Sequence, residues 1–152
     1  YEHPDYDEIE FFTEEPDQAI VAKKEGRCYL AFRGTIQTID DWLQNAGLGT
    51  AVIYKDNIDT GSTSDSCSVR GGFADFLSTA SVARGREDLQ RCVDTCEDPS
   101  DCLVITGHSQ GGATASVAAI TLFSLQPILV TFGQPPTMDP GCAYINNTRY
   151  YR

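Results

Sequence analysis

The sequence contains few histidines, few basic residues and no long apolar run. Its two histidines are His3 and His108, and 11 Lys and Arg stand against 22 Asp and Glu, a formal net charge of −11. Such a surface repels phosphate backbones and anionic membranes, so a nucleic acid is excluded as an expected partner. No apolar run has the length of a membrane span, and no signal peptide is recognisable. We therefore expect that an exported form has already lost its leader.

The acidic residues are concentrated at the N-terminus. Residues 1–17 hold eight acids and no Lys or Arg, whereas the other 135 residues hold 14 acids and 11 bases. A charge run of this kind is typical of a solvated tail or edge rather than of a docking segment. The interpretation is an acidic N-terminal arm over residues 1–17, followed by one domain over residues 18–152. A chain of this length buries roughly 70% of its unfolded surface, which suffices for one core.

The cysteine content favours an oxidising compartment. Six cysteines are an even number and exceed what a cytosolic domain of this size usually holds. They permit 15 pairings, among which Cys96 with Cys102 is the first choice because it closes a short loop. A glycosylation sequon at Asn146 adds weak support for a secreted protein or one in an endomembrane lumen. The cysteines are Cys28, Cys67, Cys92, Cys96, Cys102 and Cys142.

Zinc is the alternative use of these cysteines. Cys92 and Cys96 are one helical turn apart, and Cys102 follows closely. No second close-spaced Cys or His pair completes a tetrahedral set, so disulfides are preferred. The sequence predicts no metal and no cofactor.

The first half of the chain predicts strands and one helical stretch. Residues 18–24 and 27–32 are apolar-rich runs around Glu25-Gly26, the pattern of a hairpin. Residues 51–54 predict another strand, and the polar residues 56–68 predict an exposed loop. From Gly72 to Cys96 the apolar spacing becomes helical, with Gly85 between its two halves.

The second half predicts a strand–helix–strand unit. A β-branched run at residues 103–106 precedes a glycine turn, an Ala-rich helix over residues 113–125, and Pro127. Residues 128–132 form a continuous apolar run, which is typical of a strand buried in a parallel sheet. A Pro/Gly loop follows at residues 133–143, and residues 144–152 begin another strand. This order predicts the α/β class, with a mostly parallel sheet and flanking helices.

The glycine turn carries the candidate chemistry. Gly107-x-Ser109-x-Gly111 matches the nucleophile elbow, in which a serine occupies a sharp turn between a strand and a helix. The flanking glycines are required because the turn leaves no room for a Cβ, and the serine itself is held in a strained conformation. The following helix directs its N-terminal N–H groups at the same point. Ser109 is therefore predicted to be a nucleophile.

Beyond this motif, the sequence resembles the class 3, fungal-type lipase family of α/β-hydrolases. The likeness covers roughly residues 28–137 and its motifs follow the order of the family. The matching blocks are Ala31-Phe32-Arg33-Gly34-Thr35, Asp41-Trp42-Leu43 with Asn45, Gly72-Phe73, the elbow itself, and Thr131-Phe132-Gly133-Gln134-Pro135.

The resemblance assigns roles to individual residues. Thr35 and the N–H of Gln110 would form the oxyanion hole, and His108 would be a structural residue under the elbow with Gly107 and Gly111. Asp41 and Trp42 would pack and hydrogen-bond. The sequence departs from the family with Gln110 in place of Leu, Arg70 in place of His, and Pro136 in place of Arg, none of which removes a catalytic atom.

The catalytic acid and base of the triad are missing from this chain. In the family both follow the strand that Tyr150-Tyr151 begins, and the sequence ends at Arg152. A serine nucleophile needs a base within hydrogen-bond reach. His108 adjoins the serine and is directed away by the turn, His3 lies on the acidic arm, and Asp139 precedes the expected position of the acid. We therefore expect this chain to be a partial domain.

Two functions follow from this interpretation. The first is a lipase-like serine hydrolase of carboxylic lipid acyl esters whose acid and base lie outside this chain, so that the chain alone is inactive. The alternative is a catalytically inactive lipase fold that serves as a structural or binding subunit. In either case a sheet cut short would expose an edge that protein partners could cover.

Overall fold

The structure is a computed structural model that describes residues 5, 7–14, 17–34, 50–54, 66–70, 80–138 and 150–151. Its strands and helices alternate in the second half of the chain, as the sequence predicts. The elements are β1 (Glu8–Glu14), β2 (Asp17–Lys24), β3 (Arg27–Phe32), β4 (Thr50–Tyr54), β5 (Ser66–Arg70), α3 (Ala80–Val93), η2 (Pro99–Asp101), β6 (Leu103–His108), α4 (Gln110–Thr121), η3 (Phe123–Leu125), β7 (Ile128–Phe132) and β8 (Tyr150–Tyr151).

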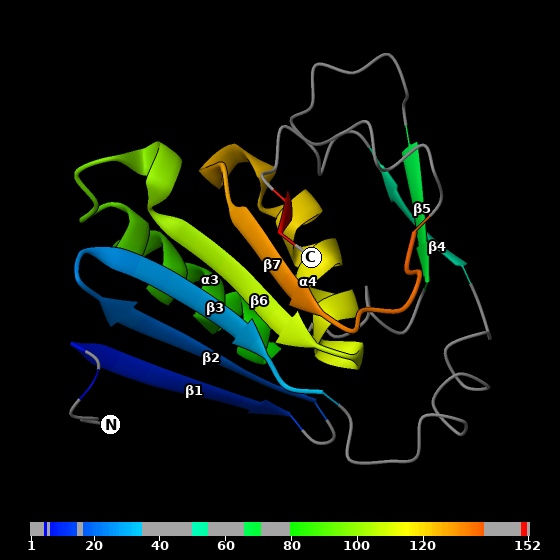
Figure 1. Ribbon diagram of the computed structural model, residues 1–152, viewed down its shortest axis with the longest axis horizontal. Helices are drawn as coiled ribbons and strands as arrows, with labels where there is room; N and C mark the ends of the chain where they lie inside the picture. Colours follow the sequence, from blue (N-terminus) through cyan, green and yellow to red (C-terminus); the bar gives the residue numbers. More distant parts are fainter. Residues whose placement is uncertain are drawn as a thin grey trace.

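The main sheet is mixed and has the strand order β1-β2-β3-β6-β7-β8 (Figure 1). The pairings β1–β2 and β2–β3 are antiparallel, whereas β3–β6, β6–β7 and β7–β8 are parallel. The parallel half, with its connecting helix, confirms the predicted α/β class. A separate hairpin of β4 and β5 stands to one side, and a bridge from Val69 to Met138 joins it to the segment after β7.

The β2–β3 hairpin is confirmed at its predicted position. Its turn residues Glu25 and Gly26 have φ angles of 50° and 76°, the left-handed pair that a two-residue hairpin turn requires. β7 has its predicted bounds, and α3 lies within the predicted helical stretch. β4 and β6 are longer than predicted, because β4 begins at Thr50 and β6 ends at His108. α4 begins three residues earlier than predicted, at Gln110, and ends at Thr121, before η3.

Two strands were not predicted. β1 lies within the acidic arm and forms an edge of the main sheet, where a charged strand is tolerated because it discourages pairing with other chains. β5 begins at Ser66, inside the stretch expected to be loop, because pairing with β4 outweighs the weak strand propensity of its polar residues.

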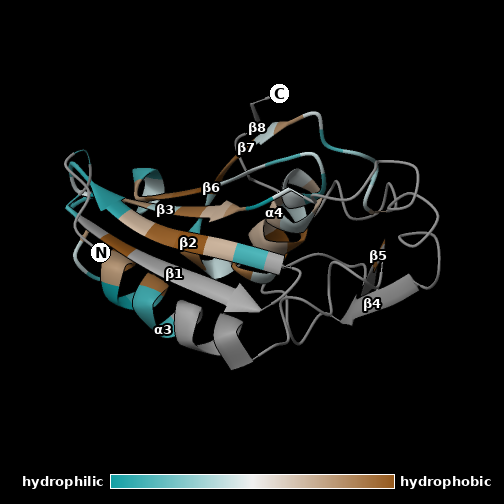
Figure 2. Ribbon diagram, turned by 90° about the horizontal axis from the view of Figure 1, so that it is seen from below, coloured by the Kyte–Doolittle hydropathy of each residue, from teal (hydrophilic) through white to brown (hydrophobic). Residues whose placement is uncertain are grey.

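The core lies between the sheet and the two helices, which pack on the same face. Side chains on alternate positions of β3 and β6 point to this face and are buried, whereas those between them are half-buried. α4 is buried from Gly111 to Ile120, and its small residues allow close approach to β3, β6 and β7. Figure 2 shows hydrophobic residues along β2 and β6, where the layers meet.

Two disulfides tie the helical layer to the sheet. Cys28 of β3 bonds Cys92 of α3, and Cys96 bonds Cys102 just before β6. The second pairing confirms the sequence prediction. Because these four sulfurs are paired, the zinc alternative does not apply to the oxidised protein. Cys67 lies on β5, and Cys142 lies outside the described residues.

None of the helices that the structure describes is long and apolar enough to cross a membrane.

Candidate active site

Ser109 occupies the junction between the last residue of β6 and the first residue of α4. Its backbone angles are φ 57° and ψ −121°, a conformation that side-chain-bearing residues rarely adopt. The Ser109 N–H donates to the carbonyl of Phe132 at 2.9 Å, and the Ser109 carbonyl accepts from the N–H of Ala113 at 3.2 Å. β7 and α4 therefore hold the turn from both sides.

The hydroxyl of Ser109 is not used to cap the helix. Although Ser109 is the N-cap of α4, its side chain makes no capping hydrogen bond. The first four N–H groups of a helix have no acceptor within it, and together with the helix dipole they favour negative charge at this point. The junction thus combines a hydroxyl that is not used for capping with a site suited to an oxyanion, to which the N–H of Gln110 would belong.

Gly107 and Gly111 allow the turn to close. A Cβ on Gly107 would lie 2.2 Å from the backbone carbon and oxygen of Gly111. A Cβ on Gly111 would lie 2.2 Å from the carbonyl oxygen of Phe32, at the end of β3. Neither contact is possible, so the two glycines bring the start of α4 against the ends of both β3 and β6.

The segment after β3 passes beside the junction. Arg33 is fixed to Gln18 on β2, through its N–H to the Gln18 carbonyl at 2.9 Å and through its guanidinium to the side-chain amide oxygen. At Gly34 a Cβ would lie only 2.9 Å from the carbonyl oxygen of His108. The chain therefore runs against β6 immediately before Thr35, the predicted oxyanion residue, which lies outside the described residues.

His108 is exposed, and its imidazole lies beside two glycines. A Cβ on Gly133 would be 3.6 Å from the imidazole Nε2, and a Cβ on Gly34 would be 3.9 Å from Nδ1. The side chains that point toward the helices from β6 are those of Leu103 and Ile105, with Gly107 next in the alternation, so the imidazole belongs to the other face of the sheet. Among the residues that the structure describes, His108 is the only histidine.

The other predicted site residues cannot be placed. Asp41, Trp42, Asn45, Gly72, Phe73, His3 and Asp139 lie outside the described residues.

Phe132 is a residue near the junction whose position the sequence analysis left unassigned. Its carbonyl accepts from Ser109, it pairs with His108 in the register of β6 and β7, and 58% of its surface is exposed. The sequence analysis included Phe132 in the Thr131–Pro135 block but assigned it no role. The alternation of buried and exposed residues along β7 shows that its ring faces away from the core.

Comparisons with known proteins agree with this architecture. Residues 29–151 match the sequence model of the family described as Lipase (class 3). Among curated proteins, none matches the chain in sequence.

Solved fungal lipases have the same fold. The Rhizomucor miehei lipase in complex with its propeptide is 26% identical over 93% of this chain and 47% of its own, with a TM-score of 0.63. The mono- and diacylglycerol lipase of Aspergillus oryzae is 24% identical over 92% of this chain and 52% of its own, with a TM-score of 0.63. The Lip2 lipase of Yarrowia lipolytica is 23% identical over 93% of this chain and 50% of its own, with a TM-score of 0.65. The chain thus spans about half the length of these enzymes.

Proposed function

Because the chain belongs to the class 3 lipase family, we propose that it carries the nucleophile half of a lipase-like serine hydrolase, with Ser109 as the nucleophile. The observation that supports this most directly is the backbone of Ser109. A serine with φ 57° sits between a parallel strand and a helix, and its hydroxyl is not spent on the helix cap. Strain of this kind, about 1–3 kcal/mol, persists where function requires it.

The proposed reaction is hydrolysis of a carboxylic ester through an acyl-enzyme. The Ser109 hydroxyl loses its proton to a base and attacks the ester carbonyl, giving a tetrahedral oxyanion. The N–H groups of Gln110 and Thr35 stabilise this oxyanion, and each such donor is typically worth about 100- to 1,000-fold in turnover. The alcohol leaves with a proton from the base, and water then releases the acid.

The base and its acid partner are supplied from outside these 152 residues. The sequence contains two histidines, of which His108 precedes the nucleophile on the face of the sheet away from the helices. A base must instead reach the serine oxygen within about 2.6–3.2 Å. The 152-residue chain alone should therefore be inactive, whereas a polypeptide that adds an acid and a histidine should turn over.

The proposed substrate is a lipid acyl ester. The family name and the names of the Rhizomucor and Aspergillus enzymes support acylglycerols as the class. The disulfides support action outside the cytosol, as a secreted or lumenal protein.

Hydrolysis of p-nitrophenyl esters of increasing acyl length by the protein encoded by the complete gene tests the proposal. Ser109→Ala should lower turnover by at least about 1,000-fold while the circular dichroism spectrum is unchanged. Ser100→Ala, the same chemical change at an exposed serine of η2, should leave turnover within about twofold. Measurable turnover that is equal in wild type and Ser109→Ala would show that another group is the nucleophile.

A lipase-fold subunit without activity is the second candidate. It is favoured by the half-buried positions on the sheet face opposite α3 and α4, which a protein partner could cover. In the assay above, this candidate predicts a folded protein that hydrolyses no ester in either form. These positions are Tyr29, Ala31, Val104, Thr106, Ile128 and Val130.

A further inference from the structure

Four cysteine sulfurs converge at the end of the sheet opposite the elbow. Cys28 is near the start of β3, and Cys102 immediately precedes β6, where its carbonyl accepts from the N–H of Cys28 at 2.8 Å. Cys92 lies in the last turn of α3, and Cys96 follows that helix. The backbone of two adjacent strands and one helix end thus fixes all four positions.

The two disulfides are in direct contact with each other. The Cys28 sulfur is 3.8 Å from the Cys96 sulfur and 3.9 Å from the Cys102 sulfur. All the sulfurs of these three residues lie within 4.8 Å of one another, and the fourth, that of Cys92, is bonded to Cys28. Cys28 and Cys102 are 0% and 2% exposed, so the cluster is shielded from solvent on one side.

These separations match the edge of a zinc tetrathiolate. With Zn–S bonds of about 2.3 Å, neighbouring sulfurs in a regular tetrahedron are about 3.8 Å apart. Two edges of such a tetrahedron, from Cys28 to Cys96 and from Cys28 to Cys102, are therefore already in place. The two bonded pairs need only separate from bonding distance to this edge length, a movement that rotation of the cysteine side chains can supply.

We propose that the reduced form of this protein binds one Zn²⁺ through Cys28, Cys92, Cys96 and Cys102. In the first step, each disulfide takes two electrons and two protons from a dithiol reductant, which itself becomes a disulfide. In the second step, the four thiols release four protons as their thiolates bind the cation. This site is independent of the proposed ester hydrolysis, because it lies at the other end of β6 from Ser109.

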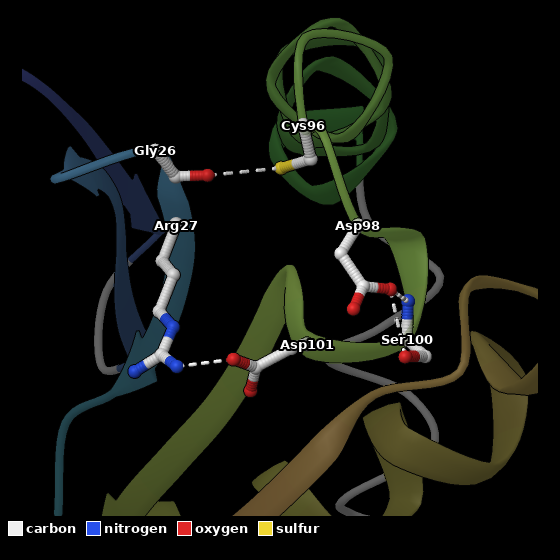
Figure 3. Close-up of polar contacts among 6 residues, drawn as sticks. All are labelled: Gly26, Arg27, Cys96, Asp98, Ser100 and Asp101. Atoms are coloured by element: carbon white, nitrogen blue, oxygen red, sulfur yellow. Dashed lines mark hydrogen bonds and ion pairs between the residues drawn. The ribbon is translucent and has the colours of Figure 1, made fainter.

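A hollow of about 720 Å³ lies beside the cluster, and Cys102 is part of its lining. A proposed metal site needs an entry path, and this hollow offers one. Within it, the Arg27 guanidinium pairs with Asp101, whose hydrogen bond raises the pKa of Arg27 (Figure 3). Asp98 accepts from the N–H and hydroxyl of Ser100, at 2.9 and 2.7 Å. The charged residues that line the hollow are Glu25, Arg27, Glu97, Asp98 and Asp101.

The charge around this opening is negative. Four carboxyl groups line the hollow against one guanidinium, so the local field attracts a divalent cation. The Cys96 side chain points toward the β2–β3 turn, where its sulfur lies 3.2 Å from the carbonyl oxygen of Gly26, a residue that lines the hollow (Figure 3). A cation that approaches from this acidic side meets the cluster at Cys102, the cysteine that lines the hollow.

Titration of the reduced protein with Co²⁺ tests the proposal. The purified protein is reduced with a phosphine, desalted without oxygen and titrated while the visible and near-ultraviolet absorption is recorded. We expect one Co²⁺ per chain with the intense bands of tetrahedral cobalt and sulfur-to-cobalt charge transfer, displaced by one equivalent of Zn²⁺. The oxidised protein should give none of these bands.

Two variants distinguish this cluster from other thiols. Cys67→Ser/Cys142→Ser keeps the four cysteines and should bind Co²⁺ as wild type does. Cys28→Ser/Cys102→Ser should weaken binding by more than about 100-fold, because even changes beyond the metal ligands cost about 10- to 100-fold.

Cobalt spectra typical of oxygen ligands, or equal binding by both variants, would overturn the proposal. Near-ultraviolet circular dichroism of the reduced protein, recorded with and without Co²⁺, shows whether the chain is folded. A reduced chain that stays unfolded and spectrally blank with Co²⁺ present would show that no such site forms.

Discussion

Ser109 has a backbone conformation that glycine adopts freely and other residues adopt at a cost of about 1–3 kcal/mol. Replacing it with glycine removes this strain, although glycine also loses more chain entropy on folding. We expect Ser109→Gly to be more stable than Ser109→Ala by about 1–2 kcal/mol in urea denaturation. Equal midpoints for the two variants would mean that the turn is unstrained.

Gly111 tests the close approach of α4 to β3. Replacing a glycine inside a helix with alanine normally raises the stability of the protein by about 1 kcal/mol. Here the added methyl would lie 2.2 Å from the Phe32 carbonyl oxygen, so we expect Gly111→Ala to lower the free energy of unfolding by more than about 3 kcal/mol.

Gly26→Ala is the matched control for that substitution. Its Cβ would meet nothing within 4 Å, so only its left-handed φ of 76° opposes alanine, at about 1–2 kcal/mol. A Gly111→Ala protein as stable as Gly26→Ala in the same denaturation experiment would contradict the packing described here.

Single residues also show which parts of the site can be predicted from sequence. Gly107, Ser109 and Gly111 form a local turn, and their spacing along the chain is therefore sufficient to predict that turn. A triad base meets its serine only through the fold, so local spacing does not locate it. The position of Phe132 depended in the same way on the register between β6 and β7.

At the level of elements, the strand–helix–strand unit was predictable because its signals agree. A continuous apolar run predicts a buried parallel strand, and glycine and proline mark where the helix between the strands begins and stops. β1 was missed because its many acids resemble a solvated arm, although an edge strand tolerates them. β5 was missed because it is short and polar and is specified mainly by its partner β4.

The two disulfides should differ in their effect on stability. In the chain-entropy description, the 64-residue separation of Cys28–Cys92 predicts a loss of about 4 kcal/mol on removal, and the 6-residue separation of Cys96–Cys102 a loss of about 2 kcal/mol. Guanidinium denaturation of the double-alanine variants measures both. Equal losses would show that loop closure does not dominate.

At the level of the whole molecule, the acidic charge is concentrated in the N-terminal part of the sequence. Most of the net charge of −11 comes from residues 1–17, which include β1. Charge on an edge strand discourages pairing with other chains and supports solubility.

Deletion of residues 1–16 tests that role. It removes β1, uncovers the edge of β2 and takes away most of the net charge. We expect the shortened protein to self-associate, which light scattering after size-exclusion chromatography detects. A monomer at the same concentration as the parent protein would contradict the role of β1 as a protective edge.

The central claim is that Ser109 is the nucleophile of a class 3 lipase fold. Reaction of the folded protein from the complete gene with a fluorophosphonate, followed by mass spectrometry of its peptides, tests it most directly. The account predicts one adduct per chain, on the oxygen of Ser109, and none in Ser109→Ala. A folded protein that stays unlabelled, or that is labelled at another serine, would contradict it.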